Sequence, residues 1–217
     1  MKSVGLRMLL CAAFLISHFS LLTSCSESDE VVDAEYANWQ ARNDAYFASL
    51  EDSLIMAWSS SLATEASRWN KIKTYTKDEE AVTANTDYIY IKVLEQGTGT
   101  TCPLYTDSVR VSYRGRLIPT ANYPQGYVFD ETYEGSYSRN TTGIVDGVVS
   151  NFRDGFATAL QHMHIGDRWR VFIPYQLGYG TSDYLTIPAY SVLIFDMALI
   201  DFSTGTEPLA PWSSRQW

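Results

Sequence analysis

Aromatic and aliphatic side chains surround a few isolated polar groups in the C-terminal half of this 217-residue chain. The segment from Gly155 to Phe202 has apolar residues at the junctions of its expected elements and almost none of the polar residues that covalent or metal catalysis uses. This composition indicates a site that acts through shape and exclusion of water. The candidate residues from the whole chain are Tyr113, Phe129, Asp130, Phe156, Tyr179, Ile187 and Phe195.

Other reaction classes lack their residues. His162 and His164 are two positions apart, so on a helix they face different directions and do not share a metal ion as an i, i+4 pair does. The sequence contains no nucleophile elbow, no phosphate-binding glycine loop and no pair of carboxylates in an apolar frame. We therefore expect no metal site and no cofactor.

Composition and charge limit the kind of partner. Apolar residues make up 46% of the chain, which is enough for a packed core, and aromatic residues make up 14%. The formal net charge is −9, and lysine and arginine form no basic stripe. Nucleic-acid binding is disfavoured, because neutralising phosphates requires concentrated positive charge.

The N-terminus predicts export. Lys2 and Arg7 precede an apolar run that is too short to span a membrane as a mature helix, which is typical of a signal peptide over residues 1–24. Leu-Thr-Ser followed by Cys25 resembles the bacterial lipobox, in which this cysteine is acylated; an ordinary cleaved signal or an uncleaved anchor is the alternative. We expect a lipid-anchored protein of the cell envelope at the outer membrane, with residues 25–33 as an acidic tether.

The three cysteines leave no pair for an intrachain disulfide in the predicted mature chain. Cys11 departs with the signal peptide, and lipid occupies Cys25. Cys102 is then the remaining free thiol, which argues against a disulfide framework or a cysteine-based redox site.

A helical N-terminal extension is predicted over residues 34–77. Its apolar residues recur at steps of three and four from Tyr36 to Trp58, without Gly or Pro. This extension either packs on the main domain or forms a dimer with another copy, and packing within the chain is the simpler option. Residues 204–217 are expected to form a C-terminal tail.

Strand patterns dominate residues 84–203. Alternating apolar residues predict strands over 88–95, 109–116, 169–173 and 193–202, the last apolar on both faces and therefore central. Residues 133–151 are expected to be a surface loop. Phe152, Phe156, Leu160 and Met163 recur at helical spacing, with Gly166 as a C-cap. The expected fold class is α+β, with a sheet covering one short helix.

The ordered motifs VRVSYRG, VFDET, GFATALQHMHIGD, IPYQLGYG and IPAYSVLIFDMALID resemble those of the FKBP-type peptidyl-prolyl cis-trans isomerases. The resemblance extends from about Tyr88 to Phe202, and together with the lipobox it suggests a lipoprotein member of the Bacteroidetes type. It implies the FKBP-like antiparallel sheet wrapped around a helix, and it implies proline-containing polypeptides as partners.

The resemblance also implies roles for the candidate residues. Phe156 takes the place of the usual tryptophan at the pocket floor, and Tyr179 and Asp130 take the places of the polar pocket residues. The catalytic set implied in this way is Asp130, Tyr179 and Tyr113, and the substrate-binding set is Phe129, Phe152, Phe156, Ile187 and Phe195. Arg153 departs from the family pattern, which has a β-branched apolar residue there.

These parts favour an isomerase that assists the folding of exported proteins by stabilising a twisted X-Pro amide without covalent chemistry. The alternative is a peptide-binding chaperone or binding module of the same fold with little or no turnover. Phe156 and Arg153 keep this alternative open, because both change the wall of the expected pocket.

Overall fold

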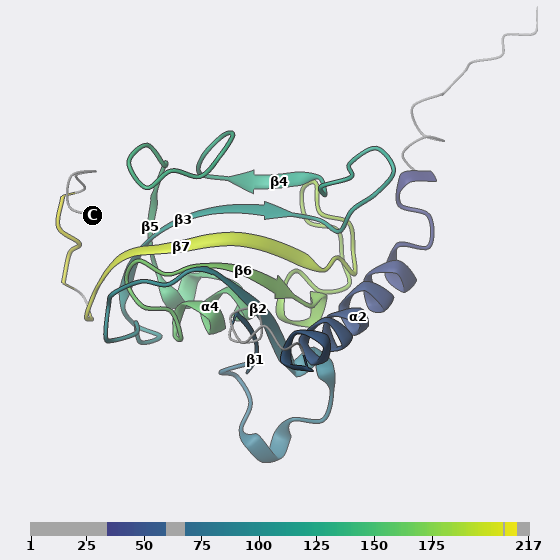
Figure 1. Ribbon diagram of the computed structural model, residues 1–217, viewed down its shortest axis with the longest axis horizontal. Coiled ribbons are helices and arrows are strands. Elements are labelled where there is room, and N and C mark those ends of the chain that lie inside the picture. Colours follow the sequence, from purple (N-terminus) through teal and green to yellow (C-terminus); the bar gives the residue numbers. More distant parts are fainter. Residues whose placement is uncertain (1–33, 60–67, 206, 212–217) are drawn as a thin grey trace, which may run out of the picture. The chain divides into compact units, whose positions relative to one another are not determined.

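The computed structural model describes residues 34–59, 68–205 and 207–211 (Figure 1). The predicted signal peptide, the acidic tether and Cys25 lie outside the described residues. The helices are α2 (Trp39–Ser59) and α4 (Asp154–Leu160), and the strands are β1 (Trp69–Lys73), β2 (Tyr88–Glu95), β3 (Ser108–Arg116), β4 (Val128–Glu131), β5 (Val145–Val148), β6 (Arg168–Ile173) and β7 (Leu193–Ser203). Short 3-10 helices occupy Glu79–Ala81, Asn85–Asp87, Val149–Asn151 and Tyr175–Leu177.

The strands form one antiparallel sheet in the order β1-β2-β6-β7-β3-β4, and β5 pairs with β3 beside this path. Figure 1 shows the strands following this order, with α4 packed against the side of β2 and β6. Strand β7 pairs with β6 and β3, and its first eight residues are buried. The prediction of a central C-terminal strand is confirmed, as is the α+β class with a sheet around a short helix.

Helix α4 lies unusually close to the sheet. A Cβ atom on Gly155 would come within 2.3 Å of Ile173 Cγ2 in β6, so only glycine allows this approach. The predicted helix through Met163 with Gly166 as its cap was too long. The backbone N–H groups of His162 and Met163 bond three residues back, to Ala159 and Leu160, because the chain tightens there. Gly166 follows with a φ of 91°, and its backbone N–H donates to the carbonyl oxygen of Leu199 in β7.

The predicted helical extension over residues 34–77 is wrong at its C-terminal end. Residues 69–73 form strand β1, which pairs with Tyr88–Lys92 of β2. The sheet therefore begins before the predicted domain boundary at residue 84. Five residues with one buried side chain, Ile72, carry little helical preference, and pairing with a neighbouring strand decides their conformation.

The predicted loop over residues 133–151 also contains regular structure. Val145–Val148 pair with Ser108–Val111, although Val145, Asp146 and Gly147 show no buried apolar periodicity. Arg110 anchors this strand through a bidentate ion pair with Asp146 at 2.7 Å. Sequence periodicity did not reveal β5, because its position depends on this side chain and not on an apolar face.

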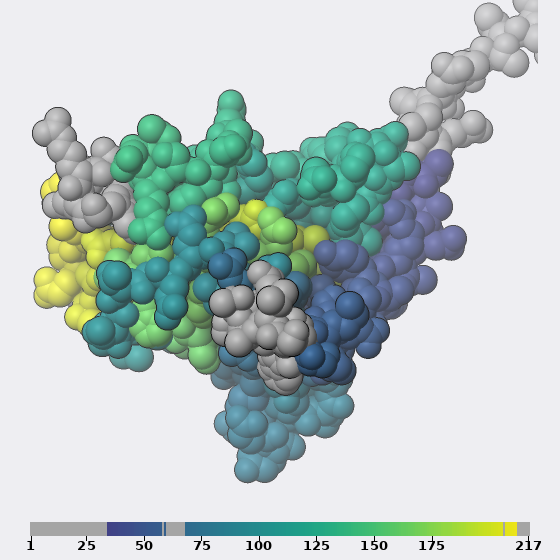
Figure 2. Space-filling view, viewed as in Figure 1, coloured from purple at the N-terminus to yellow at the C-terminus, as the bar shows by residue number. Residues whose placement is uncertain are grey.

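Helix α2 packs on the domain of the same chain, on the sheet face opposite to α4. Phe47 meets the ring of Tyr90 edge-on at 5.3 Å, and Tyr90 alternates with residues that face α4. Asn43 is fully buried and accepts the backbone N–H of Val192 at 2.7 Å. The space-filling view shows α2 against the segment around residue 120, where Arg42 donates to the carbonyl of Pro119 (Figure 2).

The apolar spacing predicted for α2 matches its buried face. Its buried residues are Trp39, Asn43, Phe47, Leu50 and Leu54. Among the described side chains of the helix, the large apolar ones that are exposed are Ile55 and Met56. Within the described residues, no helix is long and apolar enough to cross a membrane.

Candidate active site

A pocket of about 520 Å³ opens beside the N-terminal end of α4, and we call it the aromatic pocket. Residues of β3, β4, β6, β7, α4 and the loop after β6 meet there. The residues lining the aromatic pocket are Tyr113, Phe129, Asp130, Ser150, Asn151, Phe152, Arg153, Asp154, Phe156, Ile173, Tyr179, Tyr184, Leu193 and Phe195.

Phe156 is the floor of the aromatic pocket. It is buried and stacks on Phe152, with ring centroids 4.8 Å apart and planes 16° apart. It also meets Phe195 and Tyr113 edge-on, at 5.1 and 5.6 Å. Edge-to-face contacts of this kind hold aromatic rings in fixed orientations, so the floor is a rigid apolar surface.

Gly115 of β3 gives the aromatic wall its shape. A Cβ atom at this position would lie 2.6 Å from carbon atoms of both Phe129 and Phe195. These two rings meet edge-on at 5.5 Å, directly over the glycine. A side chain on Gly115 would therefore displace the wall of the pocket.

Tyr113 and Asp130 form the polar edge of the aromatic pocket. The Tyr113 hydroxyl donates to Asp130 Oδ2 at 2.8 Å. Burial and this bond to a carboxylate both raise the pKa of Tyr113, so the hydroxyl stays protonated and its O–H remains on Asp130. Asp130 itself is exposed at the mouth, not enclosed among apolar neighbours as the sequence suggested.

Arg153 covers the opposite edge. Its guanidinium carbon lies 4.6 Å from the ring centroid of Tyr179, and Tyr179 stacks on Tyr184 at 4.3 Å. Burial, followed by the neighbouring Tyr184, raises the pKa of Tyr179, while Arg153 acts in the opposite direction. The three side chains form a cation-on-aromatic stack that closes this side of the pocket.

Ile187 is not among the residues that line the aromatic pocket, and its role in substrate binding stays a prediction. It is buried, and its backbone pairs with that of Tyr184 through two hydrogen bonds of 2.8 and 2.9 Å. Asp183 accepts the backbone N–H of Ala189 at 2.8 Å and closes the same loop. Ile187 therefore fixes the loop from inside, while Tyr184 and not Ile187 faces the pocket.

The structure brings together the other seven predicted pocket residues, and it adds some that the sequence did not assign. Tyr184, Ile173 and Leu193 line the pocket without having been predicted as site residues. Leu193 and Ile173 lie on the same strand faces as predicted core residues. The alternation of apolar residues therefore cannot tell a residue that lines the pocket from one that is buried in the core.

Comparisons with known proteins agree with this geometry. Residues 99–200 match the family described as FKBP-type peptidyl-prolyl cis-trans isomerase. The chain is 40% identical over 113 residues to the macrophage infectivity potentiator of Trypanosoma cruzi, covering 52% of each chain. It is 32% identical over 124 residues to the FKBP-type 22 kDa peptidyl-prolyl cis-trans isomerase of Escherichia coli, covering 57% of this chain and 54% of the relative.

The fold agrees with a solved structure as well. The crystal structure of FkpA from Escherichia coli matches with a TM-score of 0.50 at 23% identity, covering 81% of this chain and 66% of that one. The chain spans about half the length of the two curated relatives. Residues 99–200 are therefore similar to the FKBP-type peptidyl-prolyl cis-trans isomerases in sequence, and the described domain is similar to FkpA in fold.

Proposed function

We propose that the FKBP-type domain is a peptidyl-prolyl cis-trans isomerase that binds X-Pro segments in the aromatic pocket and assists the folding of exported proteins. The observation that carries this proposal is the rigid aromatic floor and wall around Phe156, bordered by a hydroxyl already held by Asp130. The volume of about 520 Å³ suits a proline ring with its neighbouring residue.

The chemistry requires no covalent intermediate. Rotation about an X-Pro bond has a barrier of roughly 20 kcal/mol, because it breaks amide resonance. The planar amide is the more dipolar form, so a dry aromatic pocket stabilises it less than water does. The twisted amide is less dipolar and therefore loses less solvation free energy when it enters the pocket. An enzyme gains rate only from this difference between ground state and transition state.

The polar groups act at the edges of the pocket. Because Tyr179 lines the pocket, we assign its hydroxyl as the donor to a substrate carbonyl oxygen. Asp130 orients the Tyr113 hydroxyl through the 2.8 Å hydrogen bond. The phenylalanine and tyrosine rings bind the proline ring, and the hydroxyl groups fix the direction of the amide.

A proline-isomerisation assay on a short peptide tests this function. We expect wild-type protein to accelerate isomerisation, and we expect Tyr179→Phe and Asp130→Ala each to reduce kcat/KM by about tenfold, the loss that one hydrogen bond of roughly 1.4 kcal/mol predicts. Tyr123→Phe is the matched control, since Tyr123 packs on Tyr127 outside the pocket. Wild-type protein at the uncatalysed rate would refute the proposal.

Arg153 supports a second candidate, a peptide-binding module or chaperone with little turnover. Its guanidinium covers the ring of Tyr179, so a substrate must pack beside a cation and not beside an apolar side chain. Binding of a proline peptide by wild type without acceleration, together with faster isomerisation by Arg153→Val, would favour this candidate over the first.

We also propose that the mature protein is anchored to the cell envelope by lipid on Cys25, at the bacterial outer membrane. The support is the sequence alone: a positive start, an apolar run and a cysteine after Leu-Thr-Ser. Cys25→Ala should move the protein from the membrane fraction to the soluble fraction, with Cys102→Ala as the control that stays at the membrane. Unchanged partitioning of Cys25→Ala would contradict lipidation.

A further inference from the structure

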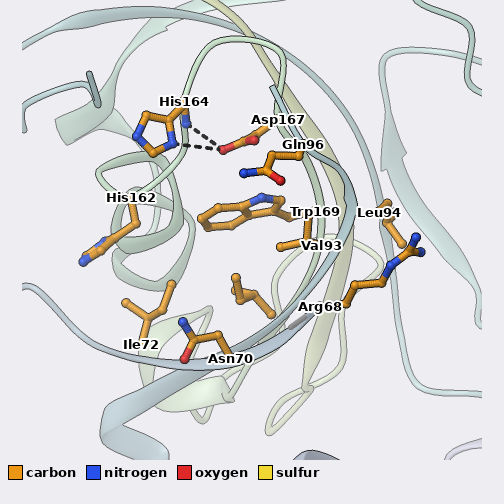
Figure 3. Close-up of a pocket in the computed structure, with 11 residues that line it drawn as sticks. Arg68, Asn70, Ile72, Val93, Leu94, Gln96, His162, His164, Asp167 and Trp169 are labelled. Atoms are coloured by element: carbon orange, nitrogen blue, oxygen red, sulfur yellow. Dashed lines mark hydrogen bonds and ion pairs between the residues drawn. The ribbon is translucent and has the colours of Figure 1, made fainter. Parts of the chain in front are cut away.

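A second hollow of about 670 Å³ opens at the other end of α4, and we call it the Trp169 pocket (Figure 3). Helix α4 has seven residues and is about 10 Å long, whereas the eleven residues of β7 extend over about 36 Å. The sheet therefore extends beyond both ends of the helix. The aromatic pocket includes Phe156 at the start of α4, and the Trp169 pocket includes His162 just after its end.

The indole of Trp169 carries an unsatisfied donor in this pocket. The residue is only 7% exposed, and its Nε1 is buried without a hydrogen-bond partner among the described residues. An indole N–H can only donate, and leaving a buried donor unpaired costs roughly 1–3 kcal/mol. Figure 3 shows the ring in the middle of the pocket, with its nitrogen on the side of Gln96. Because Nε1 is buried, an acceptor oxygen can reach it only when the neighbouring Gln96 side chain moves aside, and its hydrogen bond would then remove this cost.

The charged groups around the pocket do not select an ion. The Asp167 carboxylate already accepts the backbone N–H groups of Gly97 at 2.7 Å and of His164 at 2.8 Å, and it lies 3.5 Å from the His164 imidazole. The Nδ1 atom of His162 forms a hydrogen bond of 2.9 Å with the carbonyl oxygen of Thr158. The guanidinium of Arg68 extends away from Trp169 in Figure 3. One cation at the rim and one carboxylate engaged by the backbone favour an uncharged ligand.

The remaining wall matches a peptide. Ile72, Ile91 and Val93 supply aliphatic surface, whereas Asn70 and Gln96 supply side-chain carboxamides. A carboxamide donates and accepts hydrogen bonds as a peptide group does. The aliphatic surface is contributed by neighbouring strands β1 and β2, so it forms a continuous apolar strip beside the polar groups.

From these contacts we propose that the Trp169 pocket is a second binding site, for an uncharged peptide segment with an aliphatic side chain. A carbonyl oxygen of the peptide accepts the Trp169 N–H, the aliphatic side chain packs on Ile72 and Ile91, and the carboxamides bond the flanking peptide groups. The site does not use proline, and it stands whether or not the aromatic pocket catalyses isomerisation.

The indole N–H resonance of Trp169 in the ¹H–¹⁵N spectrum of the full chain reports this hydrogen bond directly. Its loss in Trp169→Phe assigns it. We expect a saturable shift with N-acetyl-Leu-Val-N-methylamide, which lacks proline, and none with N-acetyl-Gly-Gly-N-methylamide. Asp130→Ala should give the same titration, because it alters only the aromatic pocket.

A binding measurement with the labelled Leu-Val peptide completes the test. Trp169→Phe keeps the aromatic surface and removes the donor, so we expect binding to weaken about fivefold, the value of one hydrogen bond of about 1 kcal/mol. Three results would overturn the proposal: no saturable shift with the Leu-Val peptide, an equal shift with hexanoate, or a shift in peptide-free Gln96→Ala as large as the one the peptide causes. The last result would show that Gln96 already accepts the N–H.

Discussion

The aromatic pocket and the Trp169 pocket lie under one sheet at opposite ends of one short helix, but their polar groups differ. In the aromatic pocket the hydroxyl of the half-buried Tyr113 has a partner in Asp130, and aromatic rings surround Phe156. In the Trp169 pocket a buried N–H has no partner among the described residues, and aliphatic side chains form the apolar part of the wall. The first arrangement is complete without a ligand, whereas the second lacks an acceptor. Pockets of similar size can thus be suited to different tasks.

Truncation of the aromatic floor should have the largest effect. Phe156→Ala removes a buried ring that contacts Phe152, Tyr113 and Phe195, so we expect the free energy of unfolding to fall by about 3–5 kcal/mol and isomerase activity to be lost. Denaturant unfolding and the peptide assay measure the two effects. A loss below about 1 kcal/mol would show that the floor is not packed as described.

An ion-pair cluster on the central strand β7 gives the next effect. Asp196 of β7 is buried between Arg170 and Arg116, with hydrogen bonds of 2.6–2.9 Å. Burial raises the pKa of Asp196, but the two arginines outweigh it, so the net shift is downward from 3.8. We expect Asp196→Asn to cost about 1–3 kcal/mol at neutral pH, because it leaves two partly exposed arginines without the buried carboxylate that pairs them.

The pH dependence of this stability has a defined sign. Since the folded-state pKa of Asp196 is lowered, its contribution is present above the unfolded value near 3.8 and is lost as the pH falls below it. Wild type should therefore lose stability more steeply than Asp196→Asn in acid. Parallel curves for the two proteins would contradict the ion-pair account.

A methyl group at Gly115 should separate the two pockets functionally. Gly115→Ala places Cβ against Phe129 and Phe195, so we expect about 1–3 kcal/mol of destabilisation and a strong loss of isomerase activity, with unchanged titration of the Trp169 indole. Gly135→Ala is the control: its φ is +68° but no atom lies within 4 Å of the new Cβ, so it costs stability without filling a pocket. Full activity in Gly115→Ala would contradict the wall geometry.

The smallest effect is expected in the Trp169 pocket. Trp169→Phe removes a buried ring segment but also removes the unsatisfied N–H, and these contributions oppose each other. We expect the free energy of unfolding to change by less than about 1 kcal/mol, well below the effect of Phe156→Ala. A loss comparable to that of Phe156→Ala would mean that the indole N–H has a partner in the folded protein.

The aromatic pocket could be predicted from the sequence further than the Trp169 pocket. Tyr113, Phe129 and Phe195 belong to ordered motifs in which aromatic residues alternate on strands, and the structure gathers them around Phe156. The burial of Ile187 in the loop could not be predicted, because its backbone pairing with Tyr184 is not visible in the sequence. Trp169 was expected only as a strand residue, since nothing in local sequence shows that a buried N–H lacks an acceptor.

The N-terminal boundary illustrates the same limit. The periodicity of α2 could be recognised because one helical face is apolar, but strand β1 depends on pairing with β2 fifteen or more residues later. Short strands at a sheet edge carry weak local signals, so residues 69–73 were expected to continue the helix. Tertiary pairing decided their conformation.

The backbone N–H of Val192 donates a hydrogen bond to the side chain of Asn43 in α2. The smallest segment that should fold on its own therefore includes α2. Val192 immediately precedes Leu193, which lines the aromatic pocket, and Trp39 binds the adjacent Ser191 at 2.8 Å. A chain that begins at residue 84 would lose both hydrogen bonds together with strand β1. The backbone N–H of Val192 would then have lost its partner next to the aromatic pocket. Helix α2 is thus an integral part of the folded domain, and amide hydrogen exchange at Val192 would measure how often α2 separates from the strand that follows this residue.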